Sequence, residues 1–587
     1  MRIPASAAAR NYDKQPVIEV PGDHEAWRGS AAWTALAEHA HGGTIVIDAY
    51  PGSDLPALIA AADEAMPEAV VIDVEEEAAL PPETIAAQIE GDLTDDRVFG
   101  IMSHHRLEEF YDAARLQALA DRVVGDPRQH VLIGWGAALV PLEPATLVLA
   151  DLARWEIQQR FRRGGGNWRA GNGEDDALRK FKRGYFVEWR TADRHKLSLF
   201  DHLDFLLDAN ASVDEVKLTT GDALRVGLET AARRPFRVVP FFDPGVWGGQ
   251  WMKEVCGLDP EAANYAWCFD CVPEENSLLL SVGSEVLEIP ALDVVISHPR
   301  ELLGPQTFAR FGAEFPIRFD FLDTIGGGNL SLQVHPLTEY IKQTFGMTYT
   351  QDESYYMLDA DEDAKVYLGL KPGIDPREME AALRRAETGE APFEAEEYVN
   401  TFPTQAHDHF AIPAGTVHAS GAGSMVLEIS ATPYIFTFKM WDWGRVGLDG
   451  IPRPIHLDHA MANVQWDRDT EWTREQLVNP VEPVAEGEGW REERTGLHEL
   501  EFIEVRRHWF TAPVEHDTEG TVNVLNLVQG TEAVIESPDG AFDPFTVHYA
   551  ETFIVPAEVG RYRIRPLGEG EHATVKASVR GTEMRRR

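Results

Sequence analysis

The segment GGGNLSLQVHPLTEY, residues 326–340, decides the fold of the central part of this chain. From Leu330 to His335 apolar and polar side chains alternate, which predicts a β-strand with one buried face. In such a strand Gln333 and His335 point to the same face, so an amide oxygen and an imidazole can share one metal ion. The segment therefore predicts a β-strand that can contribute two ligands to a metal site.

Two further segments carry the groups that would complete this site. Glu353 lies ahead of a β-rich run in QDESYYMLDADEDAKVYLGL, residues 351–370, and His418 ends a strand in FAIPAGTVHASGAG, residues 410–423. Two imidazoles, a carboxylate and an amide oxygen suit Zn²⁺, with Fe, Co or Mn as alternatives, and leave a position for water or substrate. Each residue alone has another interpretation, since a single histidine in a strand is more often a hydrogen-bonded core residue.

The rest of the chain after about residue 231 has the same character. Short strands are separated by Gly and Pro, and few helices interrupt them, which is typical of an all-β barrel or sandwich. A helical insert is expected around residues 375–387, with a further helical pattern near 474–478. The acidic, Glu-rich segment 480–493 predicts a boundary before a terminal β domain.

The first part of the chain follows a different pattern. Between about residues 42 and 148, short apolar runs alternate with helical patterns, which favours a parallel sheet with helices on its faces. The segment TIVIDAYPGSDLPALIAAA, residues 44–62, has the strand, loop and helix order of a phosphate-binding turn. It lacks the Lys and the Ser/Thr of the GxxxxGKS/T motif, so we interpret this region as a degenerate P-loop-like α/β domain in which ATP use is not expected.

A basic stretch lies between Arg160 and Lys196, where eight Arg and three Lys face five acidic residues. One interpretation is a mobile lid over a phosphorylated ligand, because guanidinium groups match phosphate oxygens in bidentate fashion. The other, which we favour, is a solvated loop and helix that pair with the acidic remainder of the chain.

Length and charge limit the possible partners. A chain of 587 residues exceeds the roughly 250–300 residues of one core, so two or more domains are expected. The formal net charge is -44, and such a surface repels nucleic acid and anionic lipid, so we expect neither as a partner. An anionic substrate would need a local basic cluster. The sequence does not indicate the oligomeric state.

The composition also bears on location. No window approaches the roughly 18 consecutive apolar residues of a membrane span, and the amino end has no apolar stretch before a cleavage site. Three cysteines cannot support a disulfide framework in a chain of this size, which agrees with a reducing compartment. The sequence thus predicts a cytoplasmic protein without a membrane segment.

Taken together, the segments after residue 231 resemble the class I (cupin-type) mannose-6-phosphate isomerases. The similar phrases cover about residues 234–579 and include FFDPGVWGGQWMKEVCGL, EFPIRFDFLDT, NLSLQVHP, IPAGTVHASGAGSMVLEIS and FKMWDWGRVGLDGIPRPIHL. The resemblance implies a multidomain fold in which two all-β cupin-like barrels with a helical insert follow the α/β domain. It also implies Zn²⁺ or another divalent transition metal as cofactor, with four metal ligands: Gln333, His335, Glu353 and His418.

On this basis we expect three domains. Residues 1–230 form the α/β domain, which has no assigned function and which the resemblance does not cover. Residues 231–480 form a metal-binding cupin with its helical insert at about 375–395. Residues 481–587 form a C-terminal cupin-like β domain.

The resemblance implies aldose–ketose isomerisation, in which mannose 6-phosphate or a related phosphosugar becomes the ketose through a cis-enediol. Such a reaction needs a base, an electrophile for the developing oxyanion and exclusion of water. Glu428 in VLEIS matches a pocket-facing acid and is the expected base, although a strand Glu can also face outward. Arg445, as a catalytic residue, and Arg453, as a substrate-binding residue, match basic positions beside the pocket. For either, structural pairing with Asp442 or Asp449 is the alternative.

Two positions depart from the family pattern. The family commonly has a Lys two residues before the Glu ligand, where this chain has Gln351 as the expected substrate-binding residue. Lys439 stands where the family has an Arg, and we expect it to take a catalytic role. Because Gln lacks a charge and Lys is a point charge, the alternative function is a catalytically weak metal-cupin sensor or binding protein for a sugar phosphate.

Overall fold

The computed structural model describes residues 11–431, 434–448, 450, 453–496, 498 and 501–581. Within these residues the chain divides into two units, which we name the α/β unit and the β unit. The α/β unit contains residues 17–231 and 277–298. The β unit contains residues 11–16, 232–276 and 299–581.

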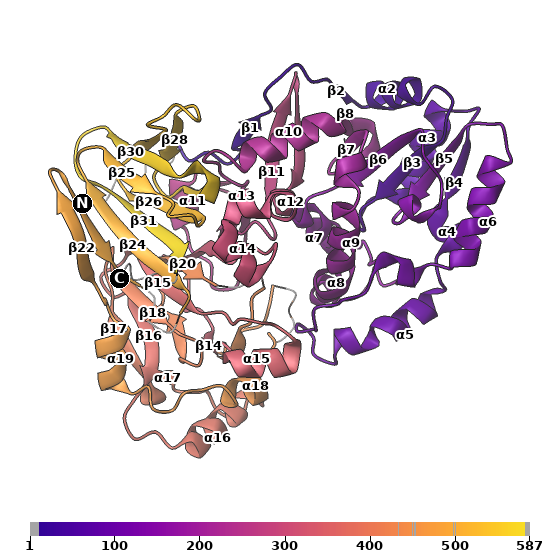
Figure 1. Ribbon diagram of the computed structural model, residues 1–587. Coiled ribbons are helices and arrows are strands. Elements are labelled where there is room, and N and C mark those ends of the chain that lie inside the picture. Colours follow the sequence, from indigo (N-terminus) through magenta and orange to yellow (C-terminus); the bar gives the residue numbers. More distant parts are fainter. Residues whose placement is uncertain are drawn as a thin grey trace. The chain divides into compact units, whose positions relative to one another are not determined.

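The α/β unit is built on a seven-stranded sheet with the order β2-β8-β7-β6-β3-β5-β4 (Figure 1). Its strands are β2 (Ala26–Arg28), β3 (Ile45–Ala49), β4 (Val70–Asp73), β5 (His130–Gly134), β6 (Thr146–Asp151), β7 (Phe205–Asp208) and β8 (Lys217–Thr220). Neighbours from β4 across to β7 are parallel, whereas β8 pairs with β7 and with β2 in antiparallel fashion. The sheet is therefore mixed, with an antiparallel edge beside the parallel strands.

The central strands β3, β5 and β6 are buried along their whole length. Near-continuous apolar runs of this kind occur where helices cover both faces of a parallel sheet. Helix α3 (Leu55–Ala65) follows β3 directly. It begins where Asp54 accepts a hydrogen bond from the N–H of Ala57 at 3.2 Å, and Pro56 suits its first turn. The strand, loop and helix order expected for residues 44–62 is present.

The other helices of this unit connect successive strands or lie between them. They are α2 (Ser30–Ala40), α4 (Val74–Ala78), α5 (Pro82–Leu93), α6 (Ala113–Val124), α7 (Arg154–Arg162), α8 (Ala177–Arg183), α9 (Trp189–Leu197) and α10 (Gly221–Ala231). In the part of the chain that the structure describes, none of the helices combines the length and the apolar character that a membrane crossing needs.

The basic stretch at residues 160–196 contributes to the interior of the α/β unit. Lys180 Nζ donates hydrogen bonds to three backbone carbonyls of the glycine-rich segment 161–173, at 2.7–3.0 Å. Lys180, Lys182 and Lys196 are only 2–4% exposed. These three lysines are thus packed inside the unit, which differs from the solvated loop and helix that the sequence favoured.

Residues 277–298 join the α/β unit although the chain has already entered the β unit before them. They form a hairpin of β11 (Ser277–Val282) and β12 (Glu285–Pro290), followed by helix α12 (Leu292–Ser297). Strand β1 (Val17–Glu19) pairs with β11 in parallel and completes a three-stranded sheet. The chain therefore contributes to the α/β unit twice.

A buried ion cluster ties α12 to the large sheet. Lys196 Nζ, from α9, lies 2.9 Å from Oδ2 of Asp151 and 2.6 Å from Oδ1 of Asp293. All three side chains are at most 2% exposed. Burial alone would lower the pKa of Lys196, but the two carboxylates more than offset burial, so its pKa is raised and the ammonium stays charged.

The β unit contains two pairs of antiparallel sheets. In the first pair, a six-stranded sheet has the order β18-β15-β20-β13-β10-β9, and a five-stranded sheet has the order β17-β16-β19-β14-β21. The six strands are β18 (His409–Ile412), β15 (Glu353–Ala360), β20 (Ser424–Ser430), β13 (Arg318–Asp323), β10 (Trp267–Cys271) and β9 (Phe241–Asp243). The five strands are β17 (Val399–Pro403), β16 (Lys365–Leu370), β19 (His418–Ser420), β14 (Leu332–Val334) and β21 (Phe438–Trp441).

The second pair has a six-stranded sheet, β22-β23-β24-β31-β26-β29, and a four-stranded sheet, β25-β30-β27-β28. The six strands are β22 (Glu482–Gly487), β23 (Trp490–Arg494), β24 (Ile503–Phe510), β31 (His572–Val579), β26 (Asn523–Gln529) and β29 (Thr552–Val555). The four strands are β25 (Val514–Asp517), β30 (Arg561–Leu567), β27 (Glu532–Glu536) and β28 (Phe545–His548). Residues from both sheets, such as Leu525 and Ile535, share one apolar core.

The two closed barrels that the resemblance implied are not present among the described residues, where each sheet is open and ends in edge strands. Short alternating strands are compatible with either arrangement, because both bury one face of every strand. Because the sheets are open, each of the two pairs in the β unit is a sandwich.

The helical segments of the β unit include α16 (Pro376–Glu387) and α19 (Thr470–Gln476), which overlap the segments where the sequence indicated helices. Helix α17 (Ala395–Tyr398) begins where the expected insert ends. At the start of α16, Asp375 accepts a hydrogen bond from the N–H of Arg377 at 2.8 Å. The remaining helices are α11 (Trp251–Val255), α13 (Pro299–Leu303), α14 (Pro305–Phe311), α15 (Thr338–Phe345) and α18 (Leu457–Met461).

Replacement of Lys196 by Met is expected to destabilise the α/β unit by about 3–5 kcal/mol, because it leaves two carboxylates buried without a cation. Chemical denaturation followed by circular dichroism measures the change. The control is Arg115→Met at an exposed site on α6, for which a change within about 0.5 kcal/mol is expected. Equal stability of the two variants would show that the ion cluster contributes nothing.

Candidate metal centre

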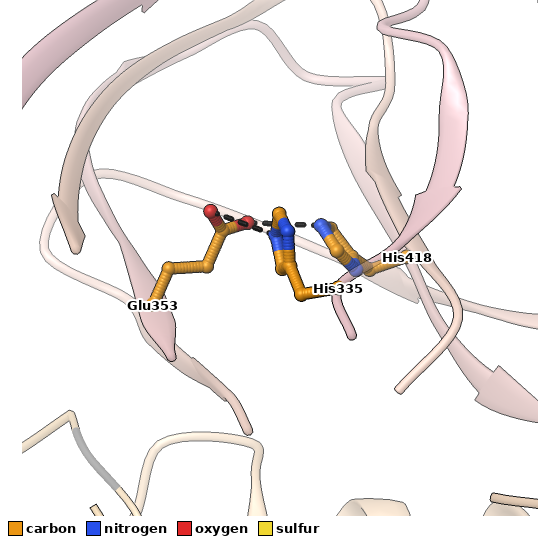
Figure 2. A group of neighbouring side chains, drawn as sticks. All are labelled: His335, Glu353 and His418. Carbon is orange, nitrogen blue, oxygen red and sulfur yellow. Dashed lines mark ion pairs between the residues drawn. The ribbon is translucent and has the colours of Figure 1, made fainter. Parts of the chain in front are cut away.

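Three ionisable side chains meet between the two sheets of the first pair. Glu353 begins β15 of the six-stranded sheet, whereas His418 begins β19 and His335 follows β14, both in the five-stranded sheet. All three side chains are fully buried. Nε2 of His335 lies 3.0 Å from Oε2 of Glu353, and Nε2 of His418 lies 2.9 Å from Oε1 of the same carboxylate (Figure 2). We name this group the His–Glu–His triad.

The backbone fixes the orientation of both imidazole rings. Nδ1 of His335 lies 3.0 Å from the carbonyl oxygen of Phe436, and Nδ1 of His418 lies 2.9 Å from that of Thr416. A carbonyl oxygen only accepts hydrogen bonds, so each Nδ1 carries a proton and donates it. In the neutral rings, Nε2 therefore presents a lone pair to the carboxylate, which is the tautomer that binds a metal through Nε2.

This arrangement needs positive charge at its centre. A carboxylate and an imidazole lone pair are both acceptors, so contacts of 2.9 and 3.0 Å require a proton or a metal ion between them. Burial favours neutral imidazole, and it lowers the pKa of His418 despite the nearby Glu353. For His335 the carboxylate outweighs burial and the pKa is raised. Within the described residues, these three are the group whose ligand atoms lie close enough to hold one ion.

The spacing of the triad fits a divalent transition metal. Its ligand atoms all lie within 4.8 Å of one another. In a tetrahedral site with ligands at about 2.1 Å, neighbouring ligand atoms are roughly 3.4 Å apart, a separation that lies within the 4.8 Å span of the triad. The buried nitrogen and carboxylate donors therefore match an ion such as Zn²⁺ in both number and type.

Two glutamines contact the triad. Nε2 of Gln333 lies 3.2 Å from Nε2 of His418, and a 180° rotation of this amide would place its oxygen, the metal-binding atom, at the same position. Gln351 Nε2 donates a hydrogen bond of 3.0 Å to Oε2 of Glu353. Gln351 therefore orients the carboxylate of the triad directly. The sequence had indicated a substrate-binding role for Gln351 and had not indicated this contact with Glu353.

Glu428 lies on the same inner face as Glu353. Strand β20 runs between β13 and β15, and Glu428 is paired with Asp320 on one side and with Tyr355 on the other. Glu353 precedes Tyr355 by two residues in β15, so these side chains share one face of the sheet. Glu428 is 7% exposed, and hence the outward-facing alternative does not apply.

The surroundings of Glu428 make its carboxyl group a weak acid. Burial is the largest influence and raises its pKa well above the usual value, and the negative charges of Glu353 and Asp320 act in the same direction. The guanidinium of Arg318 lowers the pKa but does not cancel these influences. A cation bound by Glu353 would remove part of the repulsion.

Arg318 and Asp320 are two inner-face residues that sequence reasoning missed. Arg318 Nη2 lies 2.9 Å from Oδ2 of Asp320, and both side chains are almost fully buried. Nε and Nη1 of Arg318 have no hydrogen-bond partner among the described residues. The alternation of charged and apolar residues in RFDFLD could have revealed these two residues. In a buried strand, an Arg and an Asp two residues apart lie on the same face.

The register of the five-stranded sheet places Lys439 opposite Gln333. Gln333 is paired with His418 on one side and with Lys439 on the other. Directly opposite residues of an antiparallel pair lie on the same face, so Lys439 projects from the sheet face that carries His418. Its side chain is partly buried.

Both candidate arginines are bound to a carboxylate. Nη2 of Arg445 lies 2.5 Å from Oδ1 of Asp442, and Nη1 of Arg453 lies 3.0 Å from Oδ2 of the same residue. Ser331 Oγ donates a hydrogen bond of 2.9 Å to Asp442 and links this group to the residue before β14. The structure thus has the pairing with Asp442 that the sequence left as an alternative, whereas Asp449 lies outside the described residues.

Comparisons with known proteins find two kinds of match. Residues 27–233 match a family described as a domain of unknown function (DUF8485). The mannose-6-phosphate isomerase of Streptococcus mutans is 28% identical over 220 residues, which are 37% of this chain and 63% of that protein. The mannose-6-phosphate isomerase ManA of Bacillus subtilis is 25% identical over 232 residues, which are 39% of this chain and 68% of that protein. Part of the chain is similar to mannose-6-phosphate isomerases.

Solved structures of such isomerases also align with this chain. The mannose 6-phosphate isomerase of Bacillus subtilis aligns with a TM-score of 0.48 and 18% identity, and covers 59% of this chain and 99% of that one. A mutant phosphomannose isomerase of Salmonella typhimurium aligns with a TM-score of 0.46 and 14% identity, and covers 59% of this chain and 100% of that one.

The triad is expected to bind about one Zn²⁺ per chain, and Glu353→Gln is expected to weaken binding at least ~100-fold because it removes the only anionic ligand of the triad. Gln351→Ala, which frees the carboxylate, should weaken it by about tenfold. Competition with a chelating dye and metal analysis after dialysis measure both changes.

The matched control is Glu362→Gln, at an exposed position in a turn, which should bind Zn²⁺ like the unaltered chain. Retention of full Zn²⁺ affinity by Glu353→Gln would contradict the assignment of this site.

Proposed function

We propose that this chain is a metal-dependent aldose–ketose isomerase that acts on mannose 6-phosphate or a related phosphosugar. The observation that carries the proposal is the inner face shared by Glu353, as part of the triad, and by Glu428. A metal site beside a buried carboxyl group provides the electrophile and the base that the reaction needs. The similarity to mannose-6-phosphate isomerases supports the same reaction class.

Glu428 is the base to which we assign the proton transfer. The reaction removes a proton from C2 of the open-chain aldose and returns it to C1, while the proton on the C2 oxygen moves to the C1 oxygen. Burial raises the pKa of Glu428, and a raised pKa makes its carboxylate a stronger base than an exposed glutamate. The same group, once protonated, is the acid that delivers the proton to C1.

The triad would hold a divalent ion that polarises the sugar oxygens and stabilises the negative charge of enolisation, an effect of several kcal/mol. Gln351 keeps the Glu353 carboxylate in place through its hydrogen bond of 3.0 Å. Lys439, beside Gln333 in the sheet, is the cation we assign to the developing oxyanion. Full burial of the triad excludes bulk water and strengthens each of these interactions.

Arg445 and Arg453 are the groups we assign to the phosphate of the substrate. Both guanidinium groups are bound to Asp442 at 2.5–3.0 Å, so a phosphate would share or displace this carboxylate. A planar guanidinium group can bind two phosphate oxygens at once, which gives the site its geometric selectivity. A sugar without phosphate would lack this interaction.

A sensor or binding protein for a sugar phosphate is the second candidate function. It is favoured by the pKa of Glu428, which is raised well above the usual value, because a protonated carboxyl group cannot remove a proton from C2. The same triad and arginines would then bind the ligand without turnover. The two functions differ in whether the hydrogen at C2 exchanges with solvent.

In D₂O with Zn²⁺ present, mannose 6-phosphate is expected to yield fructose 6-phosphate and to incorporate deuterium, and His335→Ala is expected to abolish both. Proton NMR of the sugar measures product and exchange together. Binding of mannose 6-phosphate with no deuterium uptake over a day would reject the isomerase and leave the binding protein.

Replacement of Glu428 by Gln is expected to lower kcat by about 10²–10⁴-fold while the metal content stays unchanged, because only the base is lost. In the unaltered chain, kcat/KM should rise with pH through the pKa of Glu428, since the carboxylate is the active form. That pKa is raised, so the acidic limb should have its midpoint above the usual value of about 4.3.

The control for this series is Glu339→Gln on the exposed side of α15, which should leave both rate and pH profile unchanged. An unchanged kcat in Glu428→Gln would show that Glu428 is not the base. This result would not bear on the assignment of the metal site.

A further inference from the structure

A large cavity lies in the α/β unit, at the carboxyl ends of its parallel strands. Its volume is about 740 Å³, within the range of about 300–1,000 Å³ that is usual for small-molecule sites. The walls come from the loop after β3 (residues 50–54), helix α7 after β6, and residues 209–213 after β7. The cavity therefore belongs to the region that matches the domain of unknown function.

The position of the cavity in the sheet is one that favours ligand binding. Strands β3 and β6 are neighbours, but the strand that follows β3 in the chain, β4, lies on one side of the pair, and β7, which follows β6, lies on the other. The chain thus leaves these two strands in opposite directions and opens a crevice between them. In open α/β sheets, ligands bind at such a point, outside the carboxyl ends of the strands.

Aromatic side chains provide part of the lining. Trp135 and Trp168 contact each other edge to face, with 4.7 Å between their ring centroids and an interplanar angle of 82°. The ring of Tyr50 lines another part of the wall. Two indole rings at right angles offer both an apolar face and an N–H edge to a ligand.

Polar groups in the same lining lack partners in the protein. Nε1 of Trp135 and Oγ of Ser53 are buried and have no hydrogen-bond partner among the described residues. A buried polar atom without a partner costs free energy, so the wall of the cavity keeps unused hydrogen-bonding capacity at these two residues.

Glu75 adds a carboxyl group that can both donate and accept. It lines the cavity, and its Oε1 accepts a hydrogen bond of 2.9 Å from the backbone N–H of Trp135. Burial raises its pKa to about 7, so its carboxyl group is partly protonated at neutral pH. A protonated carboxyl group donates one hydrogen bond and accepts others, which matches a hydroxyl group of a ligand.

The charges of the lining disfavour an anionic ligand. Arg160 is fully engaged, since it binds Glu156 at 2.9 Å and donates to the backbone carbonyls of residues 52, 209 and 210. Arg163 also binds Glu156, at 2.6 Å. The N-terminus of α3 is capped by the carboxylate of Asp54, which would repel a phosphate there.

We propose that this cavity of the α/β unit binds a neutral, hydroxyl-bearing ring, either a free monosaccharide or the ribose of a nucleoside. The indole rings of Trp135 and Trp168 pack against its apolar face, while Glu75 binds a hydroxyl group. All lining residues lie in the α/β unit, so the proposal is independent of the isomerase function proposed above.

Titration calorimetry of the full chain with D-mannose, D-fructose and adenosine tests the proposal. At least one of these ligands is expected to bind, and Trp168→Ala and Glu75→Gln should each weaken that binding by about tenfold or more. Gln at position 75 keeps an acceptor for the N–H of Trp135. Binding of a monosaccharide or of adenosine identifies which of the two sources supplies the ring.

Two controls separate this site from the metal centre and from general damage. Trp155→Ala, in α7 but outside the lining, and His335→Ala, in the triad, should both leave the affinity unchanged. If the Trp168 or Glu75 variant does not fold, hydrogen exchange of the unaltered chain decides, because saturating ligand should protect residues 50–54 and 157–163.

The proposal is overturned if none of the three ligands binds at 10 mM, a concentration of about tenfold over a weak, ~1 mM site. It is also overturned if binding is lost in His335→Ala but unchanged in the two cavity variants. Tighter binding of inorganic phosphate or ATP, with protection of residues 50–54, would contradict the assignment of a neutral ligand.

Discussion

The carboxylate of Glu353 lies between two imidazoles that project from the facing sheet, and all three groups are buried. Because both imidazoles donate from Nδ1 to backbone carbonyls, their Nε2 atoms meet the carboxylate as acceptors, and the group needs a positive charge at its centre. The two sheets must come together at a fixed separation for these atoms to meet. The need for positive charge at the triad therefore constrains how the six-stranded and five-stranded sheets of the first pair pack together.

Three arginines of the β unit are bound to carboxylates. Arg318 is paired with Asp320, and Arg445 and Arg453 share Asp442. In a chain with a formal net charge of -44, such internal pairing keeps the cations buried without leaving them uncompensated. Under the proposed function, a phosphate that binds Arg445 and Arg453 would exchange partners with Asp442.

Local pattern predicted the strand positions of the site, but the pairing between distant strands decided its geometry. The alternation from Leu330 to His335 indicated one strand, and the structure has a strand over Leu332–Val334 with His335 directly after it. That Gln333 lies between His418 and Lys439 is a property of register, which no local segment contains. The same holds for Glu428, whose inner position follows from its neighbours in β13 and β15. The lysines of the basic stretch were expected in solvent. Lys182 and Lys196 bind a carbonyl and carboxylates of other segments, which the local sequence does not reveal, whereas Lys180 binds carbonyls of the glycine-rich part of the same stretch.

The return of residues 277–298 to the α/β unit sets an order for biosynthesis. Domains commonly fold as they leave the ribosome, starting from the amino end, while translation adds about 5–20 residues per second. Here Lys196 and Asp151 are made long before Asp293, so the ammonium has only one of its two carboxylates until α12 has emerged. A fragment that stops at residue 233, where the match to the domain of unknown function ends, would also lack β11 and β12. The α/β unit therefore cannot complete its fold until residues 277–298 have been synthesised, and these residues follow the first part of the β unit in the chain.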